Sequence, residues 1–318
     1  MIQVKKFINI LEDNKINFYT GVPDSILKNF STYLEKFPLT QHVLATNEGS
    51  AISIGIGHHL STKKIPCIYM QNSGLSNAIN PLISIASEAV YSIPLFLVIG
   101  WRGSPKIADE PQHMAKGKIT PQLLRLLKIK FLILRTEKDL PKIKKLIYLA
   151  KKKNKIVACL IEKNILTTDE KKIKKIKNTH IFRPEFIREL LKSIPQESKI
   201  ISTTGYTSRE LMEIRKETSS KKGKDFYMVG GMGHSSSVAA GYALSSKKKV
   251  FCLDGDGSIL MHLGALRTIG HLGSINLRHI ILNNNSHESV GGQKTNAAGI
   301  NFEKLSKSIG YKNYFKIS

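Results

Sequence analysis

The run Gly-Asp-Gly-Ser at positions 255–258 has the composition of a site for a metal ion and a phosphate. It follows an apolar segment, and a second apolar segment further along the chain ends in three asparagines at 283–285. If both segments are parallel strands joined by a helix, their carboxyl ends lie at one edge of a sheet. The Asp256 carboxylate and the asparagine amides would then offer oxygen ligands that suit Mg²⁺, and Gly257 and Ser258 would offer N–H groups to a phosphate.

A Gly-Asp-Gly run alone is more often a tight turn, so this prediction depends on the surrounding strands and helices. Apolar strand-like runs separated by helical patterns predict parallel sheets that are covered on both faces. The strand-like runs lie near 18–21, 42–46, 66–71, 94–100, 131–136, 155–162, 199–205, 226–231, 248–257 and 276–285. The helical patterns lie near 2–11, 48–60, 77–89, 208–216, 235–244 and 259–270, with a lysine-rich one after 136.

The alternation is interrupted after Glu162 by a polar, basic segment that ends at Pro184. It contains no convincing strand, which is typical of a connection between domains. We therefore expect two parallel-sheet α/β domains, at 1–165 and 184–318, joined by a basic linker at 166–183 and without a middle domain.

The composition narrows the class of protein. The 318 residues carry a formal net charge of +25, but the lysines are spread widely and their densest runs lack interleaved aromatics, so we do not expect nucleic-acid binding.

Cys67, Cys159 and Cys252 each lie in an apolar run, as buried thiols do. No apolar run reaches the roughly 18 residues of a membrane span and the N-terminus lacks a signal peptide, so the sequence predicts a cytoplasmic protein.

The Gly-Asp-Gly run, the interval after it and the asparagine run resemble the cofactor-anchoring signature of the thiamine diphosphate enzymes. The resemblance implies thiamine diphosphate and Mg²⁺ as cofactors. It also implies that Asp256, Asn284 and the backbone carbonyl of Ser286 are the metal ligands. Because three asparagines follow one another, Asn283 is an alternative to Asn284.

The same resemblance assigns Glu48, which follows a strand-like run and opens an apolar helix, to the aminopyrimidine ring of the cofactor. A carboxylate there promotes the proton transfers that activate the cofactor. The alternative is that Glu48 only complements a helix N-terminus. Further cofactor contacts are expected from Met232, as the apolar support of the bent cofactor, and from Thr203, Thr204, Gly205, Gly231, Gly255, Gly257 and Ser258.

The absence of a middle domain is similar to the compact family members that decarboxylate phosphonopyruvate or sulfopyruvate. The resemblance to the former covers nearly the whole chain, in runs such as TGVPDSILK, NEGSAISIGIG, DEPQHMAKG and NNNSHESVGGQ. It implies decarboxylation of 3-phosphonopyruvate to phosphonoacetaldehyde and CO₂, a step of phosphonate biosynthesis. It also implies a homo-oligomer, at least a dimer, with each active site between subunits.

A small anionic 2-oxo acid needs cationic or N–H-rich recognition. Arg102, His113 and Glu288 are the candidate substrate-binding residues, with Lys116 and the segment 289–295 nearby in the sequence. Asp24 and His287 are candidates for handling protons beside the reacting carbon. The structural alternatives are a helix cap for Asp24 and a surface loop for His287.

Two further alternatives stay open. Sulfopyruvate decarboxylation would use the same residues, and a non-catalytic basic α/β protein that binds nucleic acid or acts as a scaffold would make the motif pairing coincidental. The sequence also ends with residues 314–318, where the family usually continues with a last strand and helix, so we expect the second domain to lack these elements.

Overall fold

A computed structural model describes the chain except for residues 106, 169–180, 218–224, 275 and 318. The described chain forms two compact units. The first comprises Met1–Ile173 with Val290–Gln293, and the second comprises Lys174–Ser289 with Lys294–Ser318. Most of the predicted linker at 166–183 falls outside the described residues.

The first unit is built on a six-stranded sheet in the order β3-β2-β4-β5-β7-β6, in which every pairing is parallel. The apolar runs of the sequence form its centre, and β4, β5 and β7 are almost wholly buried. The strands are β2 (Tyr19–Gly21), β3 (His42–Leu44), β4 (Cys67–Gln71), β5 (Phe96–Gly100), β6 (Lys130–Leu134) and β7 (Val157–Ile161).

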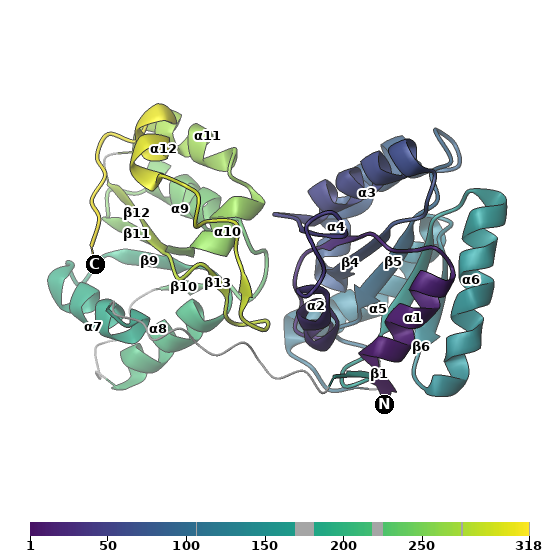
Figure 1. The fold of residues 1–318 in the computed structure, drawn as a ribbon. Coiled ribbons are helices and arrows are strands. Elements are labelled where there is room, and N and C mark those ends of the chain that lie inside the picture. The colour runs from purple at the N-terminus through teal and green to yellow at the C-terminus, as the bar shows by residue number, and fades with distance from the viewer. Residues whose placement is uncertain (106, 169–180, 218–224, 275, 318) are drawn as a thin grey trace. The chain divides into compact units, whose positions relative to one another are not determined.

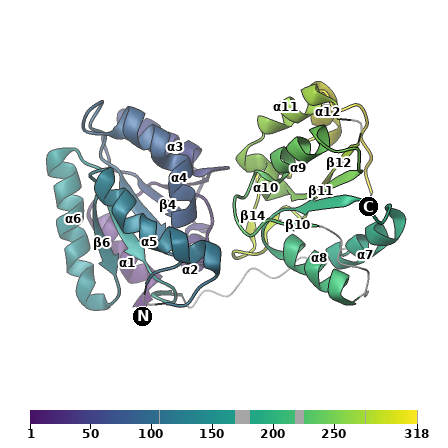
Figure 2. The same cartoon turned by 180° about the vertical axis from the view of Figure 1, so that it is seen from behind.

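Helices cover both faces of this sheet, as Figures 1 and 2 show from opposite sides. Successive strand residues point to opposite faces, so Tyr69 packs into one apolar cluster and Met70 into the other. One face carries α1 (Val4–Asp13), α2 (Lys28–Leu34) and α6 (Leu140–Lys153). The other carries α3 (Glu48–Thr62), α4 (Leu75–Pro81) with the π-helical turn η2 (Leu82–Ala86), and α5 (Pro111–Leu126). Two 3₁₀ turns, η1 (Asn72–Gly74) and η3 (Glu137–Asp139), complete the unit.

The second unit has a four-stranded parallel sheet in the order β10-β9-β11-β12, again between two layers of helices. Its strands are β9 (Lys199–Ser202), β10 (Phe226–Tyr227), β11 (Val250–Gly255) and β12 (Leu277–Leu282). The helices α7 (Arg183–Ser193) and α8 (Tyr206–Glu217) cover one face, and α9 (Ser235–Leu244) and α11 (Ala265–Leu272) cover the other. The remaining elements are α10 (Asp256–Met261), the strands β13 (Ser286–His287) and β14 (Gln293–Lys294), and α12 (Phe302–Ser308).

Each sheet has a point at which strand order reverses. In the first unit the chain goes from β2 to β3 on one side and then to β4 on the other. In the second it goes from β9 to β10 on one side and then to β11 on the other. Ligands of open parallel sheets bind outside the carboxyl ends of strands at such points. A ligand-binding site is therefore expected at the loops after β2, β4, β9 and β11.

The predicted fold class is confirmed, with differences in single elements. Helices α5, α7 and α12 were not among the predicted helices, and the pattern predicted as one helix at 259–270 is split into α10 and α11. The predicted linker begins with a short strand, β8 (Leu166–Thr167), which pairs with β1 (Ile2–Gln3) because Leu166 is buried against the first core. All three cysteines are buried and unpaired. Among the described residues, no helix is long and apolar enough to cross a membrane.

Candidate active site

The switch point of the second unit is occupied by Asp256, the first residue of α10, of which only 2% is exposed. Its carboxylate accepts a hydrogen bond from the Thr295 hydroxyl. Burial raises the pKa of Asp256, against the lowering effect of Thr295 and of the backbone N–H groups of Gly257 and Asn284. Asp256 is thus a carboxylate whose charge is incompletely compensated by the protein, which is where a bound cation would be stabilised.

Two of the predicted metal ligands, Asp256 and Asn284, lie close together in this loop cluster, and the assignment of Asp256, Asn284 and the Ser286 carbonyl to a metal stays a prediction. The Asn284 backbone N–H contacts the Asp256 carboxylate, and the Asn284 side-chain oxygen accepts from the Ser286 N–H at 3.0 Å. The Asn285 carbonyl accepts from the Thr295 N–H at 3.0 Å, which joins the asparagine loop to the residue that binds Asp256. Carboxylate, amide and carbonyl oxygens are the donors that Mg²⁺ prefers, so these residues fit that ion.

The hydroxyl of Ser258 links three of the predicted cofactor-binding segments. It lies 3.0 Å from the Thr203 hydroxyl after β9, and it accepts from the Gly233 N–H at 3.0 Å. These contacts bring the segments after β9 and β11 and the glycine-rich loop at 230–233 together at one edge of the sheet. Thr203 is buried, Thr204, Gly205 and Met232 are half-buried, and Gly231 is exposed. The support of the cofactor by Met232 stays a prediction.

His287 packs directly against the Gly-Asp-Gly turn. A Cβ atom at Gly257 would lie 2.7 Å from His287 Cε1 and 2.9 Å from its Nδ1, so only glycine fits there without a shift of the ring. Burial lowers the pKa of His287 to about 4, which leaves the imidazole neutral at pH 7. His287 is half-buried beside exposed neighbours, and its role in proton transfer stays a prediction.

Behind this turn lies a second carboxylate, Asp254, which sequence reasoning missed. It is fully buried, accepts from the Gly255 N–H at 3.0 Å and lies 3.4 Å from His279 Nε2. His279 Nδ1 is in turn 3.0 Å from the Tyr311 hydroxyl. Burial acts to raise the pKa of Asp254, but the hydrogen bond and charge of His279 prevail and lower it. An acidic residue inside the apolar run FCLDGDG was the available signal.

In the first unit, Glu48 begins α3 and is 5% exposed. Asn47 caps this helix, because its side chain accepts from the Ser50 N–H at 2.9 Å, while Glu48 Oε2 accepts from Asn77 Nδ2 at 2.9 Å. A Cβ atom at Gly74 would lie 1.9 Å from Glu48 Oε1, so the carboxylate rests on the backbone after β4. Burial raises the pKa of Glu48. A favourable interaction with the N-terminus of α3 does not by itself explain why the Glu48 carboxylate is buried and directed toward Gly74.

Asp24 lies at the switch point of the first unit and is almost completely buried. Its Oδ2 accepts from the N–H groups of Ile26 and Leu27, both at 3.1 Å, as expected of a cap for the turn before α2. The same oxygen approaches Gly100 so closely that a Cβ there would lie 2.0 Å away. Burial raises the pKa of Asp24 to about 6 despite these donors and Arg102. Asp24 is therefore both a cap and a group that titrates near neutrality.

The predicted substrate-binding residues already have protein partners. Arg102 donates through Nε to Asp109 at 2.7 Å and through Nη2 to the other Asp109 oxygen. His113 Nε2 lies 3.5 Å from Glu110, and burial lowers the pKa of the imidazole. In the second unit, Glu288 accepts from Arg183 at 3.2 Å. Asp109 and Arg183 were not predicted as partners of these residues, because Asp109 lies in the irregular loop before α5 and Arg183 is far from Glu288 in the sequence.

The geometry of both units agrees with comparisons to known proteins. Residues 4–123 match the model of the N-terminal TPP binding domain of thiamine pyrophosphate enzymes, and residues 204–318 match that of the C-terminal TPP binding domain. Thiamine pyrophosphate and thiamine diphosphate are the same cofactor. The two matches define the class of protein: a thiamine pyrophosphate enzyme with both domains in one chain.

Similarity to single proteins is more specific. Phosphonopyruvate decarboxylase of Streptomyces viridochromogenes is 32% identical over 92% of this chain and 76% of its own. The enzyme of the same name from Streptomyces hygroscopicus is 30% identical over 98% of this chain and 80% of its own. Sulfopyruvate decarboxylase of Methanosarcina acetivorans is 28% identical over 99% of this chain and 84% of its own. The chain belongs to the phosphonopyruvate decarboxylase family of thiamine pyrophosphate enzymes.

The contact between Gly257 and His287 generates a first prediction. We expect Gly257→Ala to weaken binding of thiamine diphosphate with Mg²⁺ by about tenfold, because a methyl group forced into a packed turn costs about 1–3 kcal/mol. Calorimetric titration of the purified protein measures this. The matched control is Gly264→Ala, whose Cβ would meet nothing within 4 Å in the part of the chain that the structure describes. Equal affinities of the two variants would contradict the prediction.

The burial of Asp24 generates a second prediction. Its pKa rises from 3.8 to about 6 on folding, so the folded state binds the proton more tightly than the unfolded state. Well below pH 4, where Asp24 is protonated in both states, it does not lower the free energy of unfolding. Its ionisation lowers that free energy by up to about 3 kcal/mol as the pH rises through 6.

Urea unfolding between pH 4 and pH 8 tests this. Relative to wild type, Asp24→Asn should gain stability as the pH rises, because the asparagine does not ionise. Exposed Asp13→Asn provides the control. If the difference in free energy of unfolding between Asp24→Asn and wild type stays constant with pH, stability does not depend on the titration of Asp24.

Proposed function

We propose that this protein decarboxylates 3-phosphonopyruvate to phosphonoacetaldehyde and CO₂, using thiamine diphosphate and Mg²⁺, as a step of phosphonate biosynthesis. The proposal is supported above all by the two Streptomyces phosphonopyruvate decarboxylases, because their similarity spans 92% and 98% of this chain and so includes both units. Two thiamine pyrophosphate enzyme domains in one chain also favour a carboxy-lyase over a basic scaffold or a nucleic-acid-binding protein.

The second domain, at 184–318, would hold the metal and the diphosphate. In this proposal Asp256, Asn284 and the Ser286 carbonyl bind Mg²⁺, and the N–H groups of Gly257 and Ser258 face the diphosphate. When bound, thiamine diphosphate supplies the electron sink for the charge left by loss of CO₂. The buried position of Asp256 supports the assignment, since a cation stabilises its charged form.

The first domain, at 1–165, would hold the pyrimidine and manage protons. Glu48 would keep a proton at its Oε1 or Oε2 for exchange with a ring nitrogen, and its raised pKa suits that exchange. Asp24, with a pKa of about 6, can hold or release a proton near neutral pH. His287 of the second unit is neutral and can accept or donate one at Nδ1 or Nε2.

In this family the pyrimidine and diphosphate domains that share a cofactor come from different subunits. We therefore propose a homo-oligomer, at least a dimer. Related sulfopyruvate decarboxylases support multi-chain assembly, because alpha and beta subunits are separate proteins in Methanothermobacter thermautotrophicus.

Sulfopyruvate is the second candidate substrate. The Methanosarcina acetivorans sulfopyruvate decarboxylase aligns with 99% of this chain at 28% identity, only slightly below the Streptomyces enzymes. The two substrates differ in the head group alone, so relative turnover decides between them.

Cofactor-dependent turnover tests the proposed function. Purified protein with thiamine diphosphate and Mg²⁺ is given phosphonopyruvate, sulfopyruvate or pyruvate, and aldehyde release is followed with a coupled reductase. We expect phosphonopyruvate to give the highest kcat/KM. Glu48→Gln should lower kcat by about 100-fold or more while retaining cofactor binding, since it removes a proton-transfer group.

Asp256→Ala should instead abolish calorimetric binding of thiamine diphosphate with Mg²⁺. Exposed Glu303→Gln on α12 is the carboxylate control and should match wild type. Preference for sulfopyruvate would change only the substrate. Absence of both cofactor binding and turnover in the wild-type protein would refute the proposal.

A further inference from the structure

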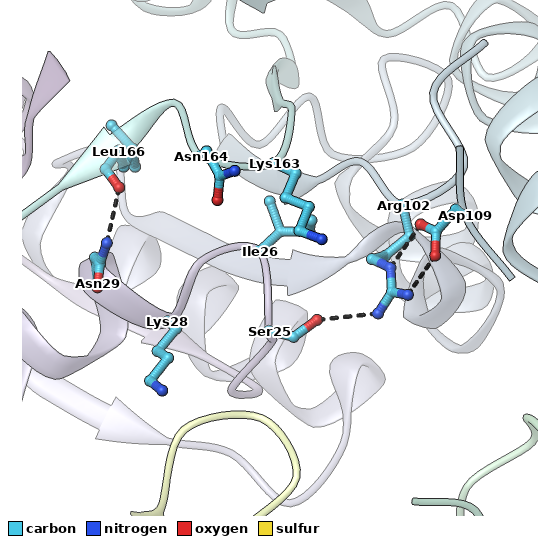
Figure 3. A pocket seen from close by; sticks show the side chains of 9 residues that line it. All are labelled: Ser25, Ile26, Lys28, Asn29, Arg102, Asp109, Lys163, Asn164 and Leu166. Atoms are coloured by element: carbon cyan, nitrogen blue, oxygen red, sulfur yellow. Dashed lines mark hydrogen bonds and ion pairs between the residues drawn. The ribbon is translucent and has the colours of Figure 1, made fainter. Parts of the chain in front are cut away.

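The first unit contains a pocket of about 300 Å³ at the carboxyl edge of its sheet (Figure 3). Its walls come from the loops that follow three strands: Ser25 after β2, Arg102 after β5 and Lys163 after β7. This volume is at the small end of the range for ligand sites, so the pocket suits a small molecule or one group of it. A nucleotide would be too large.

The charges in the pocket favour an anion. Its lining includes the cations Lys28, Arg102 and Lys163 and one carboxylate, Asp109, which is paired with Arg102. Figure 3 shows the Lys163 side chain extending past Ile26 on the side of Arg102. An anion bound between Arg102 and Lys163 would be attracted by both of these cations.

The guanidinium of Arg102 is held in a fixed orientation. Two of its nitrogens bind Asp109, and Nη1 donates to the Ser25 hydroxyl at 3.2 Å. Asp109 also accepts from the Gly103 N–H at 3.0 Å, which secures the loop after β5. Burial and these bonds place Arg102 before any ligand arrives, so less conformational entropy is lost on binding. A rigid guanidinium, a hydroxyl and an ammonium together match the oxygens of a tetrahedral oxyanion.

The pocket also adjoins the residues that were assigned to chemistry. Ser25 follows Asp24, whose carboxylate touches Gly100 at the end of β5. The Arg102 N–H donates to Asn72 Oδ1 at 3.1 Å in the η1 turn, which ends at Gly74 beneath Glu48. An anionic head group in the pocket would therefore lie along the same sheet edge as Asp24 and Glu48.

We propose that this pocket is an oxyanion subsite in which Lys163, Arg102 and Ser25 bind the phosphonate or sulfonate head of the substrate. The inference rests on the proposed function and deepens it by assigning the head group to particular residues. Lys163 is the residue that sequence reasoning did not select, because it lies in the segment assigned to the end of the first domain.

The variant Lys163→Gln tests the subsite with the full-length protein. Loss of one charge-assisted contact should raise KM for phosphonopyruvate about tenfold or more and leave kcat within about threefold. Turnover of pyruvate, which has no head group, should not change. Calorimetric titration with methylphosphonate should show the same loss of affinity without any reaction. Lys5→Gln, an exposed lysine on α1, is the matched control and should equal wild type.

The outcomes separate the two proposals. Lys163-dependent binding of methylphosphonate by a protein that turns over no 2-oxo acid would support the subsite and refute the proposed function. Phosphonopyruvate turnover and methylphosphonate binding that Lys163→Gln leaves unchanged would overturn the subsite alone. Inorganic phosphate serves as a last probe. If it binds through Lys163 but does not compete with phosphonopyruvate, the pocket is a site for free phosphate and the head-group assignment is overturned.

Discussion

Removal of carboxylates from water is the constraint on which the rest of this structure depends. Among the described residues, four buried carboxylates with a shifted pKa lie at or near the carboxyl ends of the strands: Asp24, Glu48, Asp254 and Asp256. A buried charge is costly unless hydrogen bonds or opposite charges compensate it. At Asp254 the contact with His279 is sufficient, and the pKa falls below its usual value. At the other three, burial prevails and the pKa rises.

This contrast separates a structural carboxylate from carboxylates that are available for chemistry. Asp254 has its partners within the fold and supports the turn before Asp256. Asp256 and Glu48 also have hydrogen-bond partners, but these do not fully compensate the cost of burying the charged carboxylate. Binding of a cation or a proton would therefore stabilise either group. The parallel sheets create this situation, because their strands deliver polar side chains to an edge where packed helices exclude much of the water.

Much of the fold and part of the site could be predicted from the sequence, and the reason differs from residue to residue. The continuous apolar runs of β4, β5, β7 and β11 are unambiguous, since strands buried on both faces leave little alternative. Helix α5 was missed because it contains Pro121 and has a weakly segregated apolar face. Strand ends were sufficient to predict that Asp256 and the asparagine run lie at one sheet edge, but the choice of Asn284 over Asn283 came from the family resemblance. The roles of Asn77, Asp109 and Thr295 could not be predicted, because each reaches its partner through tertiary packing that no spacing reveals.

The hydrogen-bonded chain from Asp254 through His279 to Tyr311 has a consequence for biosynthesis. Asp254 supports the turn that carries Asp256, and the outermost partner of the chain, Tyr311, follows α12 and lies 57 positions after Asp254 in the sequence. During translation the turn emerges long before Tyr311 does. Residues 254 to 311 must therefore all be synthesised before this polar chain can close, so the turn that carries Asp256 acquires its final rigidity late in folding.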